Sequence, residues 1–194
     1  MDRVTATPES KAMPLGRAVR AFVRAGMHLN FASTPGRSNA SVRELARAFV
    51  GTSPEFDLSA TGFHSLLHLL GLLELGRRYI ACFFGDNCPV PKPNPLYTRL
   101  RERGAQLEFW SVGSYVASLR AGALGLPYGL VTSLSGSDLG RELAEAGRYR
   151  ELPDPEGGGT PLGLVTPMRP DVTFLHALAG DAQGRVLCSA PFSE

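Results

Sequence analysis

The stretch MHLNFASTPGRSNASVRELARAFV, residues 27–50, contains the clearest indication of the fold class. Residues 27–31 are mainly apolar and predict a short buried strand, and residues 32–39 are small and polar and predict a loop. The following residues repeat apolar side chains at helical spacing, at Val42, Leu45, Ala46 and Phe49. A strand, a short loop and a helix in this order form the repeating unit of a parallel sheet covered by helices.

The same alternation continues through the first 132 residues. Helices are predicted at residues 14–25, 64–75, 96–103 and 115–124, and strands at residues 58–61, 78–84, 106–110 and 128–132. Shorter strands are predicted at residues 162–166, 172–177 and 185–188. We therefore predict an α/β fold with a mostly parallel sheet flanked by helices and with added strands near the C-terminus, as an antiparallel edge or hairpin. Residues 1–13 resemble a flexible leader, and residues 14–194 are predicted to form one domain.

Composition, charge and the longest apolar run exclude several classes of protein. With 194 residues, 43% hydrophobic, the chain fits one globular domain. The net charge of +2 is too small, and the basic residues too scattered, for a nucleic-acid-binding protein. The longest apolar run, residues 66–75, is too short and too polar to span a bilayer. No secretory signal is recognisable, so we expect a cytoplasmic protein without a membrane contact.

Ligands of parallel sheets bind beyond the carboxyl ends of the strands, which directs attention to five loops. These loops are residues 32–39, 62–65, 85–95, 111–114 and 132–138. The first can be interpreted in two ways. Its small residues and Arg37 suit a carboxylate, phosphate or thioester oxygen, but a tight turn in which Ser38 or Asn39 caps the next helix explains the same residues.

The histidine and cysteine residues are the candidates for metal ligands and for a catalytic nucleophile. His64 and His68 are four residues apart on a predicted helix, but no third ligand accompanies them, so a helix face in contact with a loop is the favoured interpretation. Cys82 and Cys88 match no metal-binding spacing, and no histidine is placed near Cys88 to activate it. The residues alone therefore predict neither a metal site nor a nucleophile.

Six segments carry recognisable motifs in a fixed order. They are residues 24–29, 36–45, 70–80, 111–128, 135–139 and 169–184, and the most specific parts are RAGALGLP at residues 120–127 and RPDV at residues 169–172. In this order the segments resemble the A subunit of the glutaconate branch of the family I CoA-transferases. The resemblance covers roughly residues 17–188.

The resemblance implies an α/β fold and a B subunit of similar fold, the two forming a heterodimer or heterotetramer. It implies a glutamate nucleophile on the B subunit, so no catalytic residue is expected in this chain. Coenzyme A would enter only as the thioester substrate, with no permanently bound cofactor and no metal. The A subunit is expected to line the acyl pocket, and the substrate-binding candidates are Ser33, Thr34, Gly36, Arg37, Ser38, Asn87, Val112 and Gly113.

Three departures from the family pattern bear on the reaction. Asn30 and Phe31 replace a glycine pair, Met27 replaces an aspartate, and Val112 replaces a common Gln or Glu. These changes slightly favour decarboxylation of the acyl-CoA over CoA transfer, with Arg37 as the candidate that places the leaving carboxylate. The chain also ends earlier than family A subunits do, so a C-terminally shortened subunit is expected.

The predicted function is therefore that of an A subunit acting on short glutaconyl-type dicarboxylic acyl-CoA thioesters, by CoA transfer or by decarboxylation. The alternative is a catalytically silent subunit that stabilises a B-type partner.

Overall fold

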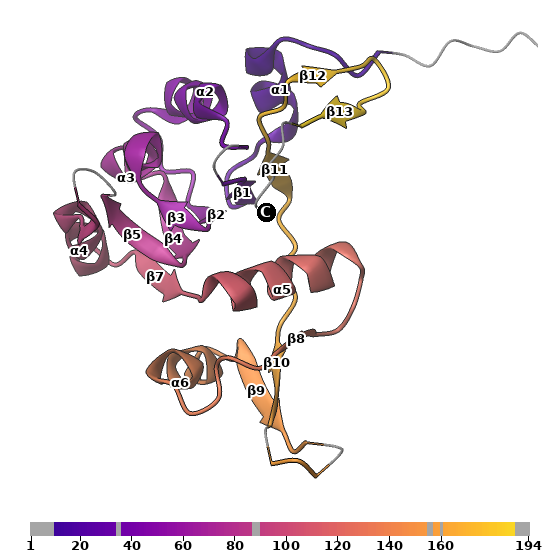
Figure 1. The fold of residues 1–194 in the computed structure, drawn as a ribbon. Coiled ribbons are helices and arrows are strands. Elements are labelled where there is room, and N and C mark those ends of the chain that lie inside the picture. Colours follow the sequence, from indigo (N-terminus) through magenta and orange to yellow (C-terminus); the bar gives the residue numbers. More distant parts are fainter. Residues whose placement is uncertain (1–9, 34–35, 87–89, 155–156, 160, 189–194) are drawn as a thin grey trace, which may run out of the picture.

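The computed structural model describes residues 10–33, 36–86, 90–154, 157–159 and 161–188. Its main sheet has five strands in the order β11-β1-β2-β4-β7, and each neighbouring pair is parallel. The strands are β1 (His28–Phe31), β2 (Phe56–Ala60), β4 (Gly76–Ala81), β7 (Gln106–Phe109) and β11 (Val172–Phe174). The predicted α/β fold with a parallel sheet is confirmed, and β11 from late in the chain lies beside β1 (Figure 1).

Four helices cover one face of this sheet. They are α1 (Leu15–Phe22), α2 (Asn39–Phe49), α3 (His68–Leu72) and α4 (Pro95–Glu102). Alternate strand side chains point towards them, so Leu29, Leu58 and Tyr79 are fully buried in a common hydrophobic core. Two of these helices, α2 and α4, begin at a residue whose side chain accepts a hydrogen bond from a free backbone N–H. Asn94, for example, caps α4 by accepting a hydrogen bond from the Leu96 N–H at 2.9 Å.

Helix α5 (Val112–Ala123) crosses the opposite face (Figure 1). A capping box of Ser111 and Ser114 starts it. A Cβ at Gly122 would collide with the carbonyl oxygen of Met168, so only glycine lets the segment that precedes β11 pack this closely on α5. Gly122 belongs to the RAGALGLP segment, and this part of the motif therefore has a packing role.

The strand predicted at residues 128–132 exists as β8 (Gly129–Val131), but its assignment to the parallel sheet was wrong. It pairs antiparallel with β10 (Leu162–Val165), which also pairs antiparallel with β9 (Tyr149–Leu152). Gly129 packs against the backbone of Ala117 in α5, so β8 lies against this helix. A helix that was not predicted, α6 (Asp138–Glu145), connects β8 to β9.

The C-terminal strands are divided between sheets. β11 is a parallel edge of the main sheet, whereas β12 (Ala179–Gly180) and β13 (Val186–Leu187) form a separate antiparallel pair. The added strands expected near the C-terminus are therefore present, and the antiparallel hairpin is confirmed.

The single helix predicted at residues 64–75 was wrong. It is replaced by a short 3-10 helix, η1 (Ser65–Leu67), followed by α3, and His64 precedes both with an extended backbone. Ser65 has a φ of 55°, a left-handed conformation that a helix running through it would not contain. His64 and His68 therefore do not share one regular helix face.

The strand predicted at residues 78–84 is interrupted at Cys82 and continues as β5 (Phe83–Asp86). β5 pairs parallel with β3 (Gly62–Phe63) and antiparallel with β6 (Lys92–Pro93). Strands β2 and β4 are thus prolonged, after a break, by a small second sheet beyond the carboxyl edge of the main one. Two of the five candidate loops, at residues 62–65 and 85–95, consequently contain short strands.

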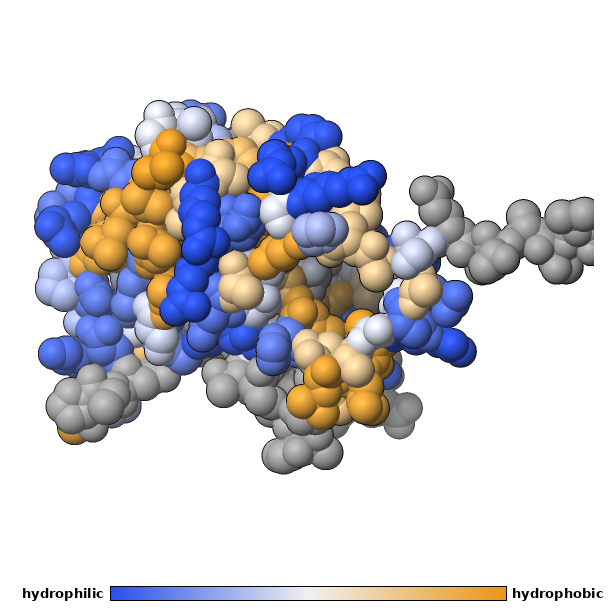
Figure 2. Space-filling model, turned by 90° about the horizontal axis from the view of Figure 1, so that it is seen from above, coloured by the Kyte–Doolittle hydropathy of each residue, from blue (hydrophilic) through white to orange (hydrophobic). Residues whose placement is uncertain are grey.

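Many large hydrophobic side chains remain on the surface. Five that are more than half exposed are Phe22, Leu72, Leu130, Leu178 and Leu187. The face seen in Figure 2 shows hydrophobic patches separated by strips of hydrophilic residues. Among the described residues, no helix is both long enough and apolar enough to cross a bilayer.

Candidate functional site

The loop that joins β1 to α2 lies at the carboxyl edge of the main sheet. Ser38 caps α2, because its Oγ accepts a hydrogen bond from the Ser41 N–H at 3.3 Å, and the capping interpretation is confirmed for this residue. The Gly36 carbonyl accepts a 2.7 Å hydrogen bond from the N–H of His176, just beyond β11. The Oγ of Ser33 is buried without a hydrogen-bond partner among the described residues. The loop is thus fixed at its C-terminal end and offers one unpaired hydroxyl.

Arg37 extends from this loop to the small second sheet. Its Nη2 donates to the Gly62 carbonyl at 3.5 Å, and its two terminal nitrogens lie 3.1 and 3.0 Å from Nδ1 and Nε2 of His64. A neutral imidazole has one acceptor nitrogen, so only one of the two contacts with His64 is a hydrogen bond. Sequence analysis did not select His64 as a site residue. Its position in the candidate loop at residues 62–65, which follows a predicted strand, was the available signal.

The surroundings of His64 keep it uncharged. Burial lowers the pKa of His64 below 6.5, and the positive charges of Arg37 and His68 lower it further. Arg37 is therefore the charged member of the pair, and it stands next to the N-terminus of α2. Both features favour an anionic group such as a substrate carboxylate.

A second set of contacts anchors the β5–β6 connection. The His68 ring lies 3.0 Å from the Asp86 carboxylate through Nε2 and 3.0 Å from the Tyr97 hydroxyl through Nδ1. Asn94 donates to Asp86 at 3.2 Å. The end of β5 is therefore attached, through Asp86, to His68 of α3 and to Asn94 at the start of α4. Asn87, the candidate within this connection, lies outside the described residues, as does Thr34.

Val112 and Gly113 form the first turn of α5, after β7. Val112 is 52% exposed, and a Cβ at Gly113 would meet no atom within 4 Å. The sheet order places the ends of β2 and β4 between this turn and the β1–α2 loop. Three inter-strand steps of about 4.8 Å separate the two by roughly 14 Å, so both border one edge without touching. Arg37 and His64 are thus in contact, whereas Val112 and Gly113 lie at a different position along the same edge of the sheet.

The departure that replaces the glycine pair, Asn30 and Phe31, lies in the strand β1 and not in the β1–α2 loop. The Asn30 side chain accepts hydrogen bonds from Ser59 at 3.0 Å and Tyr115 at 2.6 Å. Phe31 stacks on Phe174 with ring centroids 5.2 Å apart. These two residues support β1 from both faces of the sheet and do not line the β1–α2 loop.

In the part of the chain that the structure describes, no three His, Cys, Asp or Glu residues gather as a metal ion would require. Cys82 is half-buried at the break between β4 and β5. Cys88 lies outside the described residues.

A family model described as Coenzyme A transferase matches residues 13–191, nearly the whole chain. The chain belongs to the coenzyme A transferase family. No curated protein matches it significantly.

Solved structures of coenzyme A transferases share the fold. Glutaconate coenzyme A-transferase from Acidaminococcus fermentans is similar with a TM-score of 0.77 and 23% identity over 94% of this chain. A variant of the decarboxylase AibA/AibB is similar with a TM-score of 0.76 and 23% identity over 94% of this chain. An acyl-CoA transferase from Escherichia coli O157:H7, in a thioester complex with CoA, has a TM-score of 0.69 and 14% identity over 92% of this chain.

The three solved chains are longer than this one. This chain spans 62% of the glutaconate coenzyme A-transferase chain, 68% of the decarboxylase chain and 38% of the E. coli chain.

Proposed function

We propose that this coenzyme A transferase family chain is the A subunit of a heteromeric enzyme acting on short glutaconyl-type dicarboxylic acyl-CoA thioesters. The observation that carries the proposal is the position of Arg37, held against Gly62 and His64 at the carboxyl edge of the sheet. A fixed guanidinium favours an acyl group with a second carboxylate over a neutral one. The buried Oγ of Ser33 can donate a hydrogen bond to a thioester or carboxylate oxygen at the same loop.

Two reactions fit this arrangement. In CoA transfer, a glutamate carboxylate of the B subunit attacks the thioester carbonyl carbon and the C–S bond breaks. The CoA thiolate leaves and the acyl group stays on the glutamate as a mixed anhydride. The thiolate then attacks the glutamyl carbonyl carbon of this anhydride, so that a glutamyl thioester forms and the acyl group leaves as a free carboxylate. In decarboxylation, the bond to the distal carboxyl group breaks, CO2 leaves, and the thioester takes up the electron pair as an enolate that is then protonated. Arg37 would orient the distal carboxylate in both reactions.

A B-type partner is part of the proposal because the family resemblance implies that the nucleophile lies on the B subunit and that this chain contributes pocket walls. The exposed hydrophobic side chains described above support a protein partner, since contiguous apolar patches on a soluble protein are typical of interfaces. The similar decarboxylase structure is named for two components, AibA and AibB. We propose that the two subunits together complete the acyl-CoA site.

The test is to purify this chain with a B-type subunit and to assay glutaconyl-, methylglutaconyl- and acetyl-CoA. Replacing Arg37→Gln should lower kcat/KM for the two dicarboxylic thioesters by roughly 100-fold, as expected for a lost charge-assisted contact. Turnover of acetyl-CoA should change by less than about threefold, because acetyl has no second carboxylate to lose. Arg43→Gln, an exposed arginine of α2, is the matched control.

The two reactions and the alternative are separated by further readouts. Borohydride or hydroxylamine sensitivity of the B-subunit glutamate would reveal the glutamyl thioester of CoA transfer, whereas release of labelled CO2 without it would reveal decarboxylation. If Arg37→Gln lowers acetyl-CoA and glutaconyl-CoA turnover equally, Arg37 does not select the dicarboxylic acyl group. A stable complex that turns over none of the thioesters would favour the catalytically silent subunit.

A further inference from the structure

A cavity of about 170 Å³ lies on the face of the sheet that α5 crosses, away from the helices α1 to α4. Its lining includes His28, Arg78, Glu108 and Arg148, together with residues of α5 and of the segment that precedes β11. His28 is the first residue of β1, whereas Ile80 lies near the carboxyl end of β4 and Trp110 directly follows β7, so the cavity extends across the face of the sheet. None of the predicted site residues lines it.

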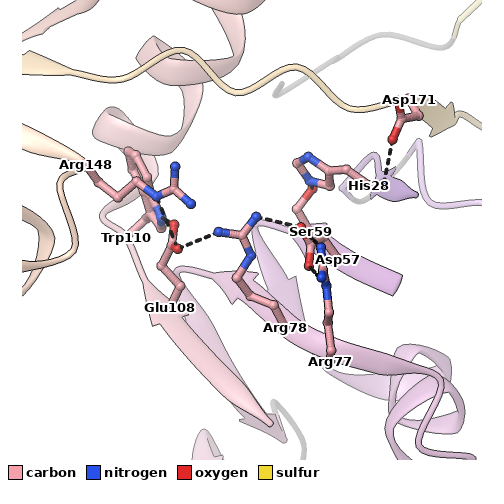
Figure 3. A network of polar contacts seen from close by, with 9 residues as sticks. All are labelled: His28, Asp57, Ser59, Arg77, Arg78, Glu108, Trp110, Arg148 and Asp171. Carbon is pink, nitrogen blue, oxygen red and sulfur yellow. Dashed lines mark hydrogen bonds and ion pairs between the residues drawn. The ribbon is translucent and has the colours of Figure 1, made fainter. Parts of the chain in front are cut away.

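Charged side chains at the floor of this cavity are held by one another. Arg78 bonds to Asp57 at 2.6 Å and to Glu108 at 3.3 Å. Glu108 also accepts hydrogen bonds from the Trp110 indole at 2.8 Å and from Nε of Arg148 at 3.4 Å. The two carboxylates are thus engaged in fixing the arginines (Figure 3).

Arg148 has donors left for a ligand. Its Nε contacts Glu108, but neither of its terminal nitrogens bonds to a described residue. Figure 3 shows the Arg148 guanidinium and the His28 imidazole on opposite sides of an open space, with Arg78 between them at its base. An oxyanion in that space would find unpaired N–H groups on one side.

The hydrogen bonds behind His28 determine which of its nitrogens carries the proton. The Ser59 hydroxyl donates its only hydrogen to Asn30, whose Oδ1 also accepts from Tyr115. Nε2 of His28 lies 2.8 Å from the Ser59 oxygen and must therefore donate to it. Nδ1 is left as a bare acceptor, and Figure 3 shows it turned away from Ser59.

The imidazole stays neutral in this setting. Burial is the main influence on the pKa of His28 and lowers it below 6.5, with Asp57 opposing and Arg78 adding to the effect. The cavity therefore presents an acceptor on one side and cationic donors on the other. Its complement is a group that combines an O–H with a negatively charged oxygen.

We propose that this cavity binds a small oxyanion that also carries a hydroxyl group, the chemical class of hydrogen phosphate and of short 2-hydroxy acids. The O–H donates to Nδ1 of His28, and the anionic oxygen accepts from the terminal nitrogens of Arg148. Neither the proposed CoA chemistry nor a partner subunit is required for this binding.

The experiment titrates the 15N-labelled chain with four probes: phosphate and glycolate, which carry the hydroxyl, and sulfate and acetate, which lack it at neutral pH. Phosphate and glycolate should shift the His28 Nδ1 resonance saturably. Sulfate and acetate should bind at least about tenfold more weakly, the difference that one lost hydrogen bond produces. Arg148→Gln should weaken phosphate and glycolate binding by at least about tenfold.

Arg141→Gln is the matched control, because Arg141 is exposed, pairs with Asp138 and does not line the cavity. It should leave the binding constants unchanged. Equal binding by Arg148→Gln and the unaltered chain would overturn the proposal, and so would the absence of saturation with either hydroxyl-bearing probe. Sulfate binding as tightly as phosphate would overturn the role of His28 as the acceptor.

Discussion

The guanidinium of Arg37 and the imidazole of His64 lie against each other, with both terminal nitrogens of the arginine within 3.1 Å of a ring nitrogen. This contact joins the β1–α2 loop to the small second sheet that prolongs β2 and β4. The Arg37 guanidinium would be mobile on an isolated loop. The contact with His64 fixes its position relative to the carboxyl ends of β1, β2 and β4. The contact also has consequences for ionisation that can be measured.

Removal of the arginine charge should raise the pKa of His64. Arg37 is the second cause that lowers this pKa, after burial, so Arg37→Gln should move it upwards towards 6.5. The measurement is an NMR titration of the His64 ring protons. Arg43→Gln removes an equal charge from the exposed face of α2 and should leave the titration unchanged. An unaltered His64 titration in Arg37→Gln would show that the pair is not coupled.

Stability should fall on mild acidification. His28 and His64 both have pKa values below 6.5 in the folded chain, so the unfolded chain binds protons more readily. Their contribution is complete above about pH 6.5 and is lost as the pH falls from there through the folded-state values. Urea denaturation between pH 5 and pH 8 measures this loss. A His28→Gln variant should show a shallower decrease, whereas an equal slope in both proteins would exclude His28 as a cause.

Two arginines that share one carboxylate should differ in their effect on stability. Arg78 is 20% exposed and bridges Asp57 and Glu108, whereas Arg77 is 57% exposed and contacts Asp57 alone. Arg78→Gln should cost about 3 kcal/mol, because it leaves the buried Asp57 and the half-buried Glu108 without their shared cation. Arg77→Gln should cost no more than about 1 kcal/mol. Similar costs for the two variants in urea denaturation would contradict the network described here.

Two glycines of α5 should also respond in opposite ways. Gly122→Ala forces a Cβ against the Met168 carbonyl and should destabilise the chain by about 2–3 kcal/mol. Gly113→Ala has open space around it and should stabilise the helix by roughly 0.5–1 kcal/mol. Thermal denaturation compares the two. A neutral Gly122→Ala would mean that the close approach of α5 and Met168 does not exist in solution.

The local pattern of residues 27–50 was sufficient to predict β1, the loop and α2, because the apolar periodicity and the Ser38 cap agree with the final structure. The local pattern also predicted the strand β8 but placed it in the wrong sheet, because the residues of a strand do not determine with which strands it pairs. Its partner strand, β10, follows much later in the sequence, after α6 and β9. Helix α6 was missed although Ser137 and Asp138 supplied a cap and a first-turn acid.

The candidate site could be predicted only in part. Strand-end topology located Ser33, Gly36, Arg37 and Ser38 at one loop, since the carboxyl ends of parallel strands share an edge. The role of His64 could not be predicted, because an apolar run with helical spacing concealed the left-handed Ser65. The polar cavity was also missed, because Asp57, Arg78 and Glu108 alternate with apolar residues along strands and meet only when the sheet forms.

The pairing of β1 with β11 has a consequence for synthesis of the chain. Asp171, next to β11, accepts a 2.7 Å hydrogen bond from the His28 N–H across a separation of 143 residues. At a translation rate of about 5–20 residues per second, roughly 7–30 s pass before the ribosome has made the partner of β1. During that time one side of β1 is an open strand edge, which is a template for pairing between nascent chains. Fast elongation, or a chaperone that covers β1, should therefore increase the yield of correctly folded protein.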